Sequence, residues 1–358
     1  MSTSRGPAKT YGVVVVGAGN ISAAHIFAVE GLPNATLVGI VGRSPERAIA
    51  LADKHGVTHF GSLDEALTHP DVDIVSICTP SGAHLEPALA AIAAGKHVIV
   101  EKPIEVTVER SRRLVEAAEA AGVVVGAIFM SRFAPANAFA KQAIEEGRLG
   151  RLLQVDGYVK WWRDQAYYDS GAWRGTQALD GGGALMNQGI HQVDLLQWLA
   201  GPVAEVFAYA GTLNHERLEV EDTLVGVLRY ENGAYGHLAT ATSLWPCRPK
   251  SLQVHGTEGF LTIEDDMLVD WRTRAGGDAE RAELLARYGG AGQGGSSDPM
   301  AISFQNHLLQ YRDFLAALDA GTQPAIDGSE GIKAVELVEA FYASAKSGGP
   351  RAVRERNA

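Results

Sequence analysis

The chain has 358 residues, of which 46% are hydrophobic and 20% are charged, and its formal net charge is −11. This length predicts two domains of about 100–200 residues each, and the composition is typical of a globular protein with a sizeable core. No basic block interrupts the acidic balance, so a surface for nucleic acid is not expected.

The cysteines and the N-terminus indicate the compartment. Cys78 and Cys247 have neither a Cys-x-x-Cys nor a Cys/His metal spacing, and the first ten residues lack the apolar run of a signal peptide. No stretch of about 20 apolar residues is present to span a bilayer. We therefore expect a soluble cytoplasmic protein that binds no metal and no membrane.

The first predicted element lies in the stretch 13-VVVVGAGNISAAH-25, which reads as a buried strand, a glycine turn and a helix. Gly17 permits a tight turn, and Gly19 lets the backbone approach a pyrophosphate at the helix N-terminus. The third position of the dinucleotide fingerprint is Ser22 instead of Gly or Ala. We predict that the cofactor contacts Gly17, Gly19, Asn20 and Ile21.

Three more strands are predicted in the first third of the chain, with helical segments between them, at residues 36–41, 74–78 and 97–100. Alternating strands and helices predict a parallel, doubly wound sheet. An ordinary turn in another α/β sheet is the alternative explanation of the glycines.

The end of the second strand bears on the choice of cofactor. The stretch 41-VGRSPERA-48 has Arg43 and Ser44 where an NAD site usually has an Asp or Glu for the ribose 2′-hydroxyl. These two side chains suit a 2′-phosphate, so we predict NADP, with NAD as the alternative.

A second domain is predicted after about residue 131. Six strand-like runs recur, at residues 152–162, 204–213, 223–230, 235–244, 251–256 and 259–265. Consecutive strands without helices between them favour antiparallel pairing. Residues 275–300 break this pattern, and the run 289–299 within them is rich in Gly and Ser, as in a lid or a disordered insertion. Two helices are expected at 302–321 and 329–348.

Three further stretches carry a family resemblance, and they read 78-CTPSGAH-84, 100-VEKPIEVT-107 and 180-DGGGALMNQGIHQVDLLQWLAG-201. Together they resemble the Gfo/Idh/MocA family of oxidoreductases. The resemblance implies an α/β protein with a Rossmann domain at residues 8–130 and a second α/β domain at residues 131–348. In such proteins the second domain has a large, mostly antiparallel sheet whose open face forms the substrate pocket. Members associate through that sheet as homodimers or homotetramers, and the C-terminal helices pack toward the first domain.

The resemblance also assigns residues to the cofactor cleft. Lys102 follows the fourth strand, at the carboxyl edge where ligands bind in such folds. The matching lysine in the family bonds to the reacting hydroxyl, which makes Lys102 a catalytic, cofactor-binding and substrate-binding candidate. The other residues expected to line the cofactor are Thr79, Pro80, His84 and Glu101, although His84 equally suits a packing role.

His191 is the candidate for proton transfer. It lies on a predicted helix that begins near Leu185, and Asn187 lies four residues before it, on the same helical face. In many family members an Asp occupies the position of Asn187. Because an amide cannot take up a proton, Asn187 is expected to orient the substrate while His191 transfers the proton.

The segment 160-KWWRDQAYYDSGAWRG-175 is rich in aromatic and cationic side chains. Aromatic faces beside polar donors suit a carbohydrate, but Trp, Tyr and Arg are also common in oligomer interfaces. Together with Lys102, Asn187 and His191, the residues predicted to bind substrate are Lys160, Arg163, Trp173 and Arg174. His307 is a weaker candidate.

The predicted function is therefore an NAD(P)-dependent dehydrogenase or reductase acting on a secondary alcohol or ketone of a sugar, cyclitol or related polyol. Two alternatives stay open within enzymes, namely a trans-dihydrodiol dehydrogenase and a reductase of non-sugar carbonyls. A third alternative, from another class, is a regulator that binds nucleotide without turnover.

Overall fold

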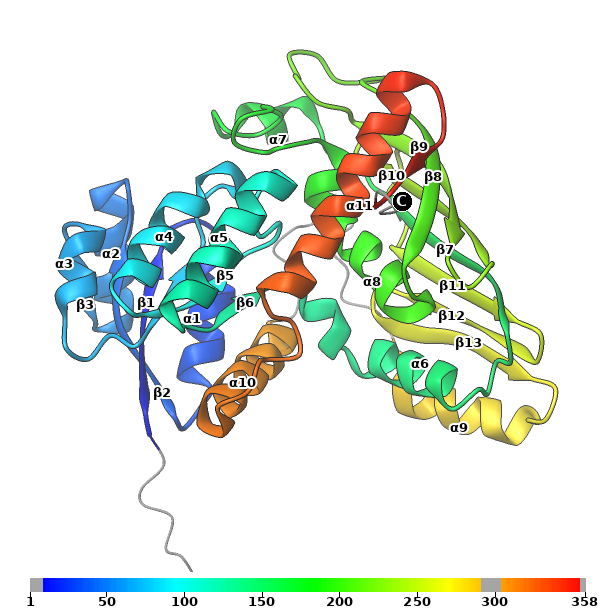
Figure 1. Ribbon diagram of the computed structural model, residues 1–358, viewed down its shortest axis with the longest axis horizontal. Helices are drawn as coiled ribbons and strands as arrows, with labels where there is room; N and C mark the ends of the chain where they lie inside the picture. The colour runs from blue at the N-terminus through cyan, green and yellow to red at the C-terminus, as the bar shows by residue number, and fades with distance from the viewer. Residues whose placement is uncertain (1–8, 291–303, 355–358) are drawn as a thin grey trace, which may run out of the picture. The chain divides into compact units, whose positions relative to one another are not determined.

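The computed structural model describes residues 9–290 and 304–354. Its contacts divide the chain into two compact units (Figure 1). The first consists mainly of residues 9–105, 109–130 and 304–332, and the second of residues 106–108, 131–290 and 333–354. The first unit thus includes residues 304–332. In the sequence analysis these residues belong to the second domain, at 131–348, as C-terminal helices that pack toward the first.

The first unit is built on a parallel sheet of six strands in the order β3-β2-β1-β4-β5-β6. Their bounds are β1 Tyr11–Val16, β2 Ala35–Val41, β3 Thr58–Phe60, β4 Ile74–Ile77, β5 His97–Val100 and β6 Val125–Ala127. The helices of this unit are α1 Ser22–Glu30, α2 Pro45–His55, α3 Leu63–Thr68, η1 Ser81–Ala83, α4 Leu85–Ala93, α5 Val108–Ala121 and α10 Gln305–Ala320.

The core of the first unit explains why its strands form where they do. All six residues of β1 and all four of β4 are buried, as expected for strands that are covered on both faces by helices. Helix α10 packs on α1, where Gly31 leaves room for the side chain of Leu308. The carboxyl ends of β1 and β4 lie side by side, because the register pairs Val16 with Ile77.

The second unit is built on a mostly antiparallel sheet of eight strands in the order β13-β12-β11-β7-β10-β9-β8-β14. The pair β7 and β10 is parallel. The strand bounds are β7 Leu152–Lys160, β8 Val203–Gly211, β9 Thr223–Tyr230, β10 Tyr235–Ala241, β11 Ser251–Gly256, β12 Gly259–Glu264, β13 Met267–Thr273 and β14 Arg351–Ala352. The fold class predicted from the sequence is confirmed.

Helices cover one face of this sheet. Leu196 of α8 packs against Gly157, and Phe341 of α11 packs against Gly226. In the chain, the helices of this unit precede the sheet, lie between its strands β7 and β8, or follow β13. Their bounds are η2 Met130–Phe133, α6 Pro135–Glu145, α7 Gln165–Asp169, η3 Leu185–Gly189 (a turn of π-helix), α8 Ile190–Ala200, α9 Asp278–Tyr288 and α11 Gly328–Ser347.

The segment expected to be a lid or a disordered insertion, residues 275–300, is in part a regular helix. Helix α9 occupies Asp278–Tyr288 and contacts β13, so these residues are not a disordered insertion. Its charged sequence has no large hydrophobic face, and none of its residues is fully buried. Residues 291–300 lie outside the described part of the chain.

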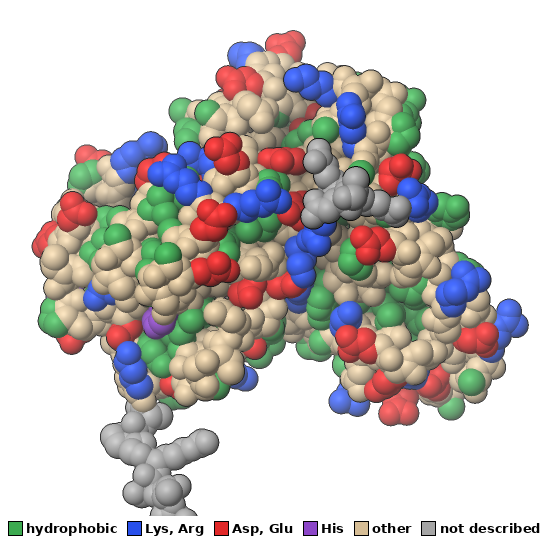
Figure 2. All heavy atoms as spheres, in the orientation of Figure 1, with side chains coloured by type: hydrophobic (Ala, Val, Ile, Leu, Met, Phe, Trp, Pro, Cys, Tyr) green, Lys and Arg blue, Asp and Glu red, His purple; other side chains and the backbone are tan. Residues whose placement is uncertain are grey.

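The face visible in Figure 2 carries charged side chains of both signs. Figure 2 shows acidic and basic side chains interspersed over the visible face, without a large basic patch there. In the described ranges, no helix is long and apolar enough to cross a bilayer.

Candidate active site

The glycine turn after β1 has the geometry of a pyrophosphate cradle. Gly17 adopts a φ of +116°, and a Cβ at this position would overlap the backbone carbonyl of Cys78. Gly19 and Asn20 are exposed, and a Cβ on Gly19 would meet no described atom within 4 Å. The first amides of α1 donate to the carbonyls of Gly19, Asn20 and Ile21, so an anion at this turn would be stabilised by the positive end of the helix dipole. The chain therefore fits a dinucleotide at this turn.

Arg43 and Ser44 follow β2, which is the neighbour of β1 in the sheet. Arg43 is exposed and forms no ion pair with a described residue. Ser44 occupies the position before α2, but its hydroxyl does not cap that helix. Both side chains are therefore available for a ligand at the carboxyl end of the sheet.

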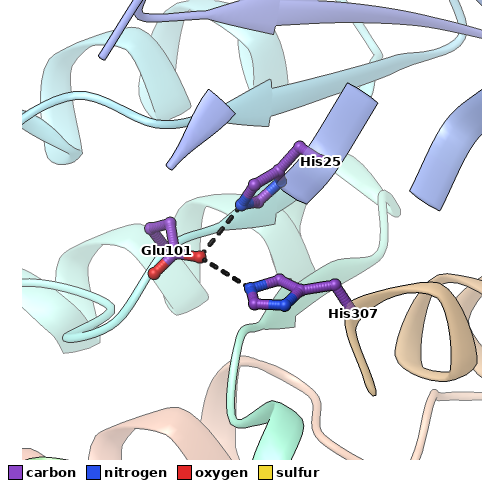
Figure 3. Close-up of side chains that lie close together, drawn as sticks. All are labelled: His25, Glu101 and His307. Atoms are coloured by element: carbon purple, nitrogen blue, oxygen red, sulfur yellow. Dashed lines mark hydrogen bonds and ion pairs between the residues drawn. The ribbon is translucent and has the colours of Figure 1, made fainter. Parts of the chain in front are cut away.

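Lys102 follows β5 at the same edge of the sheet, and it is partly exposed. The carboxylate of the preceding residue, Glu101, is buried and accepts a bond of 3.1 Å from the Lys102 amide. The other oxygen of Glu101 faces His25 and His307 (Figure 3). Glu101 therefore points into the first unit.

His84 holds the neighbouring loop in place. Its Nε2 lies 2.9 Å from the carbonyl oxygen of Thr79, and its Nδ1 lies 2.9 Å from that of Pro103. Burial lowers the pKa of His84, although its bonds to these carbonyls oppose the shift. The fully buried ring thus connects the Thr79-Pro80 loop to the segment after Lys102.

In the second unit, a buried carboxylate caps the helical segment that carries the other candidates. Glu221 accepts bonds from the amides of Gly183 and Leu185, at 2.9 and 2.8 Å, and from the hydroxyl of Tyr342 at 3.1 Å. A Cβ on Gly183 would overlap the carbonyl oxygen of Glu221, so glycine is required here. Burial raises the pKa of Glu221 to about 7, against the opposing effect of these donors.

Asn187 and His191 lie one helical turn apart at the start of this segment, and both are partly exposed. The Asn187 side-chain amide donates a 2.6 Å bond to Asp180, whose other oxygen accepts from the amide of Gly175 at 2.8 Å. Asp180 therefore fixes the orientation of Asn187 and ties it to the loop that follows Arg174.

The aromatic segment forms a cluster around Tyr167. The Arg174 guanidinium lies over the rings of Tyr167 and Trp173, at 4.3 and 4.6 Å from their centroids. It also donates a hydrogen bond of 2.6 Å to the Tyr167 hydroxyl. Arg163 lies 5.6 Å from the same ring, and Gln188, next to Asn187, donates to the same hydroxyl at 3.3 Å. Three of the predicted substrate residues, Arg163, Trp173 and Arg174, are thus brought together beside the helix of Asn187.

Lys160 is not brought to this cluster. Side chains alternate along β7, and Val159 lies on the helix-covered face with Gly157, so Lys160 lies on the opposite, open face. There its ammonium lies 4.7 Å from the ring of Tyr158. Asn187 and His191 belong to the helix-covered face, because Gly189 packs against Thr240, which pairs with Val159. They therefore do not lie on the open face, where the family resemblance placed the substrate pocket.

Comparisons with known proteins agree with this geometry. Residues 11–129 match the model of an oxidoreductase family with an NAD-binding Rossmann fold, and residues 138–262 match the Gfo/Idh/MocA C-terminal domain. A 1,5-anhydro-D-fructose reductase from Ensifer adhaerens is 33% identical over 69% of this chain and 74% of its own length. The chain belongs to the Gfo/Idh/MocA family of oxidoreductases.

Other Gfo/Idh/MocA relatives cover nearly the whole chain. The levoglucosan dehydrogenase of Pseudarthrobacter phenanthrenivorans is 27% identical over 93% of this chain and 95% of its own length. The crystal structure of the WlbA dehydrogenase from Bordetella pertussis, in complex with NADH and UDP-GlcNAcA, has a TM-score of 0.88. It is 33% identical and covers 97% of this chain and 99% of its own. The protein is therefore a dehydrogenase or reductase with an NAD-binding Rossmann domain.

Sequence reasoning missed several residues that shape this Gfo/Idh/MocA site. Asp180 stands in the glycine-rich stretch that carried the resemblance, but nothing in the stretch indicates its bond to Asn187. Glu221 and His25 lie far from the residues they contact, at sequence separations of 36 from Leu185 and 76 from Glu101. Asp194, in the same stretch, forms a buried ion pair with Arg132.

Proposed function

We propose that this protein is an NADP-preferring dehydrogenase or reductase that acts on a secondary alcohol or ketone of a sugar or related polyol. The observation that carries the proposal is the presence of two proton-handling side chains in a member of this oxidoreductase family. Lys102 follows β5 at the carboxyl edge of the first sheet, and His191 follows Asn187 by one turn. A regulator without turnover has no need for either.

Alcohol oxidation requires a partner for the hydroxyl proton and stabilisation of the developing oxyanion. A bound nicotinamide supplies or accepts the hydride. In our proposal His191 takes the proton from the substrate hydroxyl, and the Lys102 ammonium donates a hydrogen bond to the same oxygen. Asn187, with its amide fixed by Asp180, bonds to a substrate hydroxyl without exchanging a proton.

The cluster around Tyr167 supports a sugar as substrate, and specifically a sugar with a negatively charged group. Arg174 is held between two rings and has no carboxylate partner among the described residues. Arginine binds a carboxylate or phosphate with two parallel hydrogen bonds. The WlbA dehydrogenases were crystallised in complex with a ligand of this kind, UDP-GlcNAcA.

A screen of substrates tests the proposal. The enzyme is incubated with each nicotinamide and with neutral polyols, aldoses, uronic acids, nucleotide sugars and dihydrodiols, and the absorbance of the reduced nicotinamide is followed. We expect turnover with sugars, and a lower KM for those that carry a carboxylate or phosphate. Turnover with dihydrodiols alone would contradict the sugar proposal, and no turnover with any compound would favour the regulator.

Arg43 tests the cofactor preference. We expect Arg43→Ala to raise the KM for NADP by about tenfold, the effect of about 1.4 kcal/mol, while the KM for NAD changes little. Steady-state kinetics with both cofactors measure this. NADH is present in the WlbA relatives, so a wild-type preference for NAD, unchanged in the variant, is the result that would overturn the assignment.

The open face of the second sheet supports self-association. Tyr209, Val227 and Tyr235 are 70%, 50% and 65% exposed on strands β8, β9 and β10. A hollow of about 450 Å³ lies on the same face, with Phe207 and Arg229 in its lining. Large exposed apolar patches mark interaction sites, and a sheet face is self-complementary under a twofold axis.

Two lysines introduced on this face test the proposed homodimer or homotetramer. We expect the double variant Val227→Lys and Tyr235→Lys to elute as a monomer in size-exclusion chromatography with light scattering, because like charges would meet across the interface. The wild type is expected to elute as a dimer or tetramer. A monomeric wild type would contradict the proposal.

A further inference from the structure

Three buried side chains from distant parts of the sequence meet inside the first unit (Figure 3). His25 lies on α1, Glu101 follows β5, and His307 lies on α10. The Nε2 of His25 is 2.9 Å from Oε1 of Glu101, and the Nε2 of His307 is 3.5 Å from the same oxygen. None of the three side chains is more than 7% exposed.

The hydrogen bonds around His25 define how it contacts Glu101. Its Nδ1 lies 2.7 Å from the hydroxyls of both Tyr311 and Ser76. When a hydroxyl donates to Nδ1, the ring proton lies on Nε2 and is donated to Glu101. Burial lowers the pKa of His25, which agrees with a neutral ring in this tautomer.

Glu101 carries the charge of the cluster. Burial alone would raise the pKa of this carboxyl, but hydrogen bonding by His25 and His307 holds it well below its usual range. Its second oxygen, Oε2, accepts the backbone N–H of Lys102 at 3.1 Å. An ionised carboxylate in a buried position is costly unless donors surround it. Here His25 and the Lys102 amide donate to it, and Nε2 of His307 lies 3.5 Å away.

These contacts link helix α1, which follows the glycine turn, to the backbone of Lys102. We propose that His25, Glu101 and His307 form a positioning network, which holds the backbone of Lys102 so that its side chain leaves the sheet edge in the reactive direction. The inference rests on the proposed role of Lys102. Neither histidine exchanges a proton with the substrate in this role.

A metal ion is the other explanation of the same three residues. Each offers one ligand atom, and these atoms lie within 4.8 Å of one another. The hydrogen-bonded arrangement is favoured because both oxygens of Glu101 already accept bonds, and because the His25–Glu101 distance of 2.9 Å is that of an ordinary hydrogen bond. Metal analysis of the purified protein decides between them, and one equivalent of tightly bound zinc would overturn our proposal.

Two substitutions of His307 test the network by kinetics. The amide nitrogen of Gln reaches about where Nε2 of His lies, so His307→Gln keeps a donor to Glu101, whereas His307→Leu removes it. We expect His307→Leu to lower kcat by about 10-fold or more, and His307→Gln to stay within about threefold of the wild type. Glu101→Gln is expected to lower kcat by about 10- to 100-fold, with the substrate KM nearly unchanged.

A matched control on the same helix separates positioning from packing. Gln310 is equally buried on α10 and bonds to the backbone of Ala127 and Phe129, away from Glu101. We expect Gln310→Leu to lower thermal stability but to leave kcat unchanged. An equal loss of kcat in Gln310→Leu and His307→Leu would contradict the network, as would wild-type kcat in Glu101→Gln.

The same kinetic series distinguishes failure of the network from failure of the proposed function. If Lys102→Ala is inactive while Glu101→Gln and His307→Leu are fully active, the catalytic lysine stands and the network is wrong. If Lys102→Ala is fully active, the proposed function itself fails.

Discussion

Lys102→Ala is expected to lower kcat by about 100-fold or more, and His191→Ala by a similar factor, because each removes a positioned group that stabilises charge or transfers a proton. The KM for the nicotinamide is expected to change little in the His191 variant, because the proposal assigns His191 to the substrate hydroxyl and not to the cofactor. Steady-state kinetics with the best substrate of the screen measure both effects.

Lys96 provides a matched control for Lys102. It precedes β5, at the opposite end of the strand that Lys102 follows, and its ammonium bonds to the carbonyl of Val72. Lys96→Ala removes one lysine of the same unit without touching the carboxyl edge of the sheet, so its kcat is expected to equal that of the wild type. Near-normal turnover in both Lys102→Ala and His191→Ala would remove the proposed mechanism.

A pH-dependent loss of stability is expected from Glu221, and it is expected to disappear in Glu221→Gln. Because burial raises the pKa of this carboxyl to about 7, the folded protein holds the proton more tightly than the unfolded chain does. The stabilisation by this group is therefore complete below the ordinary pKa of Glu and is lost as the pH rises toward 7. At about 1.4 kcal/mol per pKa unit, the loss amounts to about 3 kcal/mol.

The measurement compares the unfolding of both proteins in denaturant between about pH 5 and about pH 8. Glutamine has nearly the shape of glutamate but does not titrate, so Glu221→Gln is expected to lack this part of the pH dependence, whatever its overall stability. Parallel pH profiles of the two proteins would show that Glu221 titrates normally. Burial of the ionised Glu221 carboxylate, which accepts the amides of Gly183 and Leu185, would then not destabilise the folded protein.

The strands that could be predicted are those with a clear pattern. The buried valines of β1 and the alternating residues of β9 have the periodicities of a doubly covered and a half-covered strand. The strands β3 and β6 have three residues each, too few for a periodicity, and they were missed. β13 was missed because it follows β12 after a two-residue turn in which Asp265 and Asp266 adopt positive φ angles without glycine.

The site was predicted in part, because a motif identifies residue types and not their contacts. Lys102, Asn187 and His191 were found through short stretches of sequence, but Asp180, Glu221 and His25 were assigned no role. Their bonds connect residues that only tertiary packing brings together. Lys160 shows the same limit, since one step along β7 moves a side chain to the other face of the sheet.

Isotope transfer tests the central claim most directly. A sugar substrate deuterated at the carbinol carbon is incubated with the oxidised nicotinamide and the wild-type enzyme, and the reduced cofactor is analysed by mass spectrometry. A hydride mechanism predicts that the deuterium appears at C4 of the nicotinamide, and that Lys102→Ala transfers it about 100-fold more slowly than the wild type. Deuterium that exchanges into solvent, or cofactor that is never reduced by any sugar, would contradict the account.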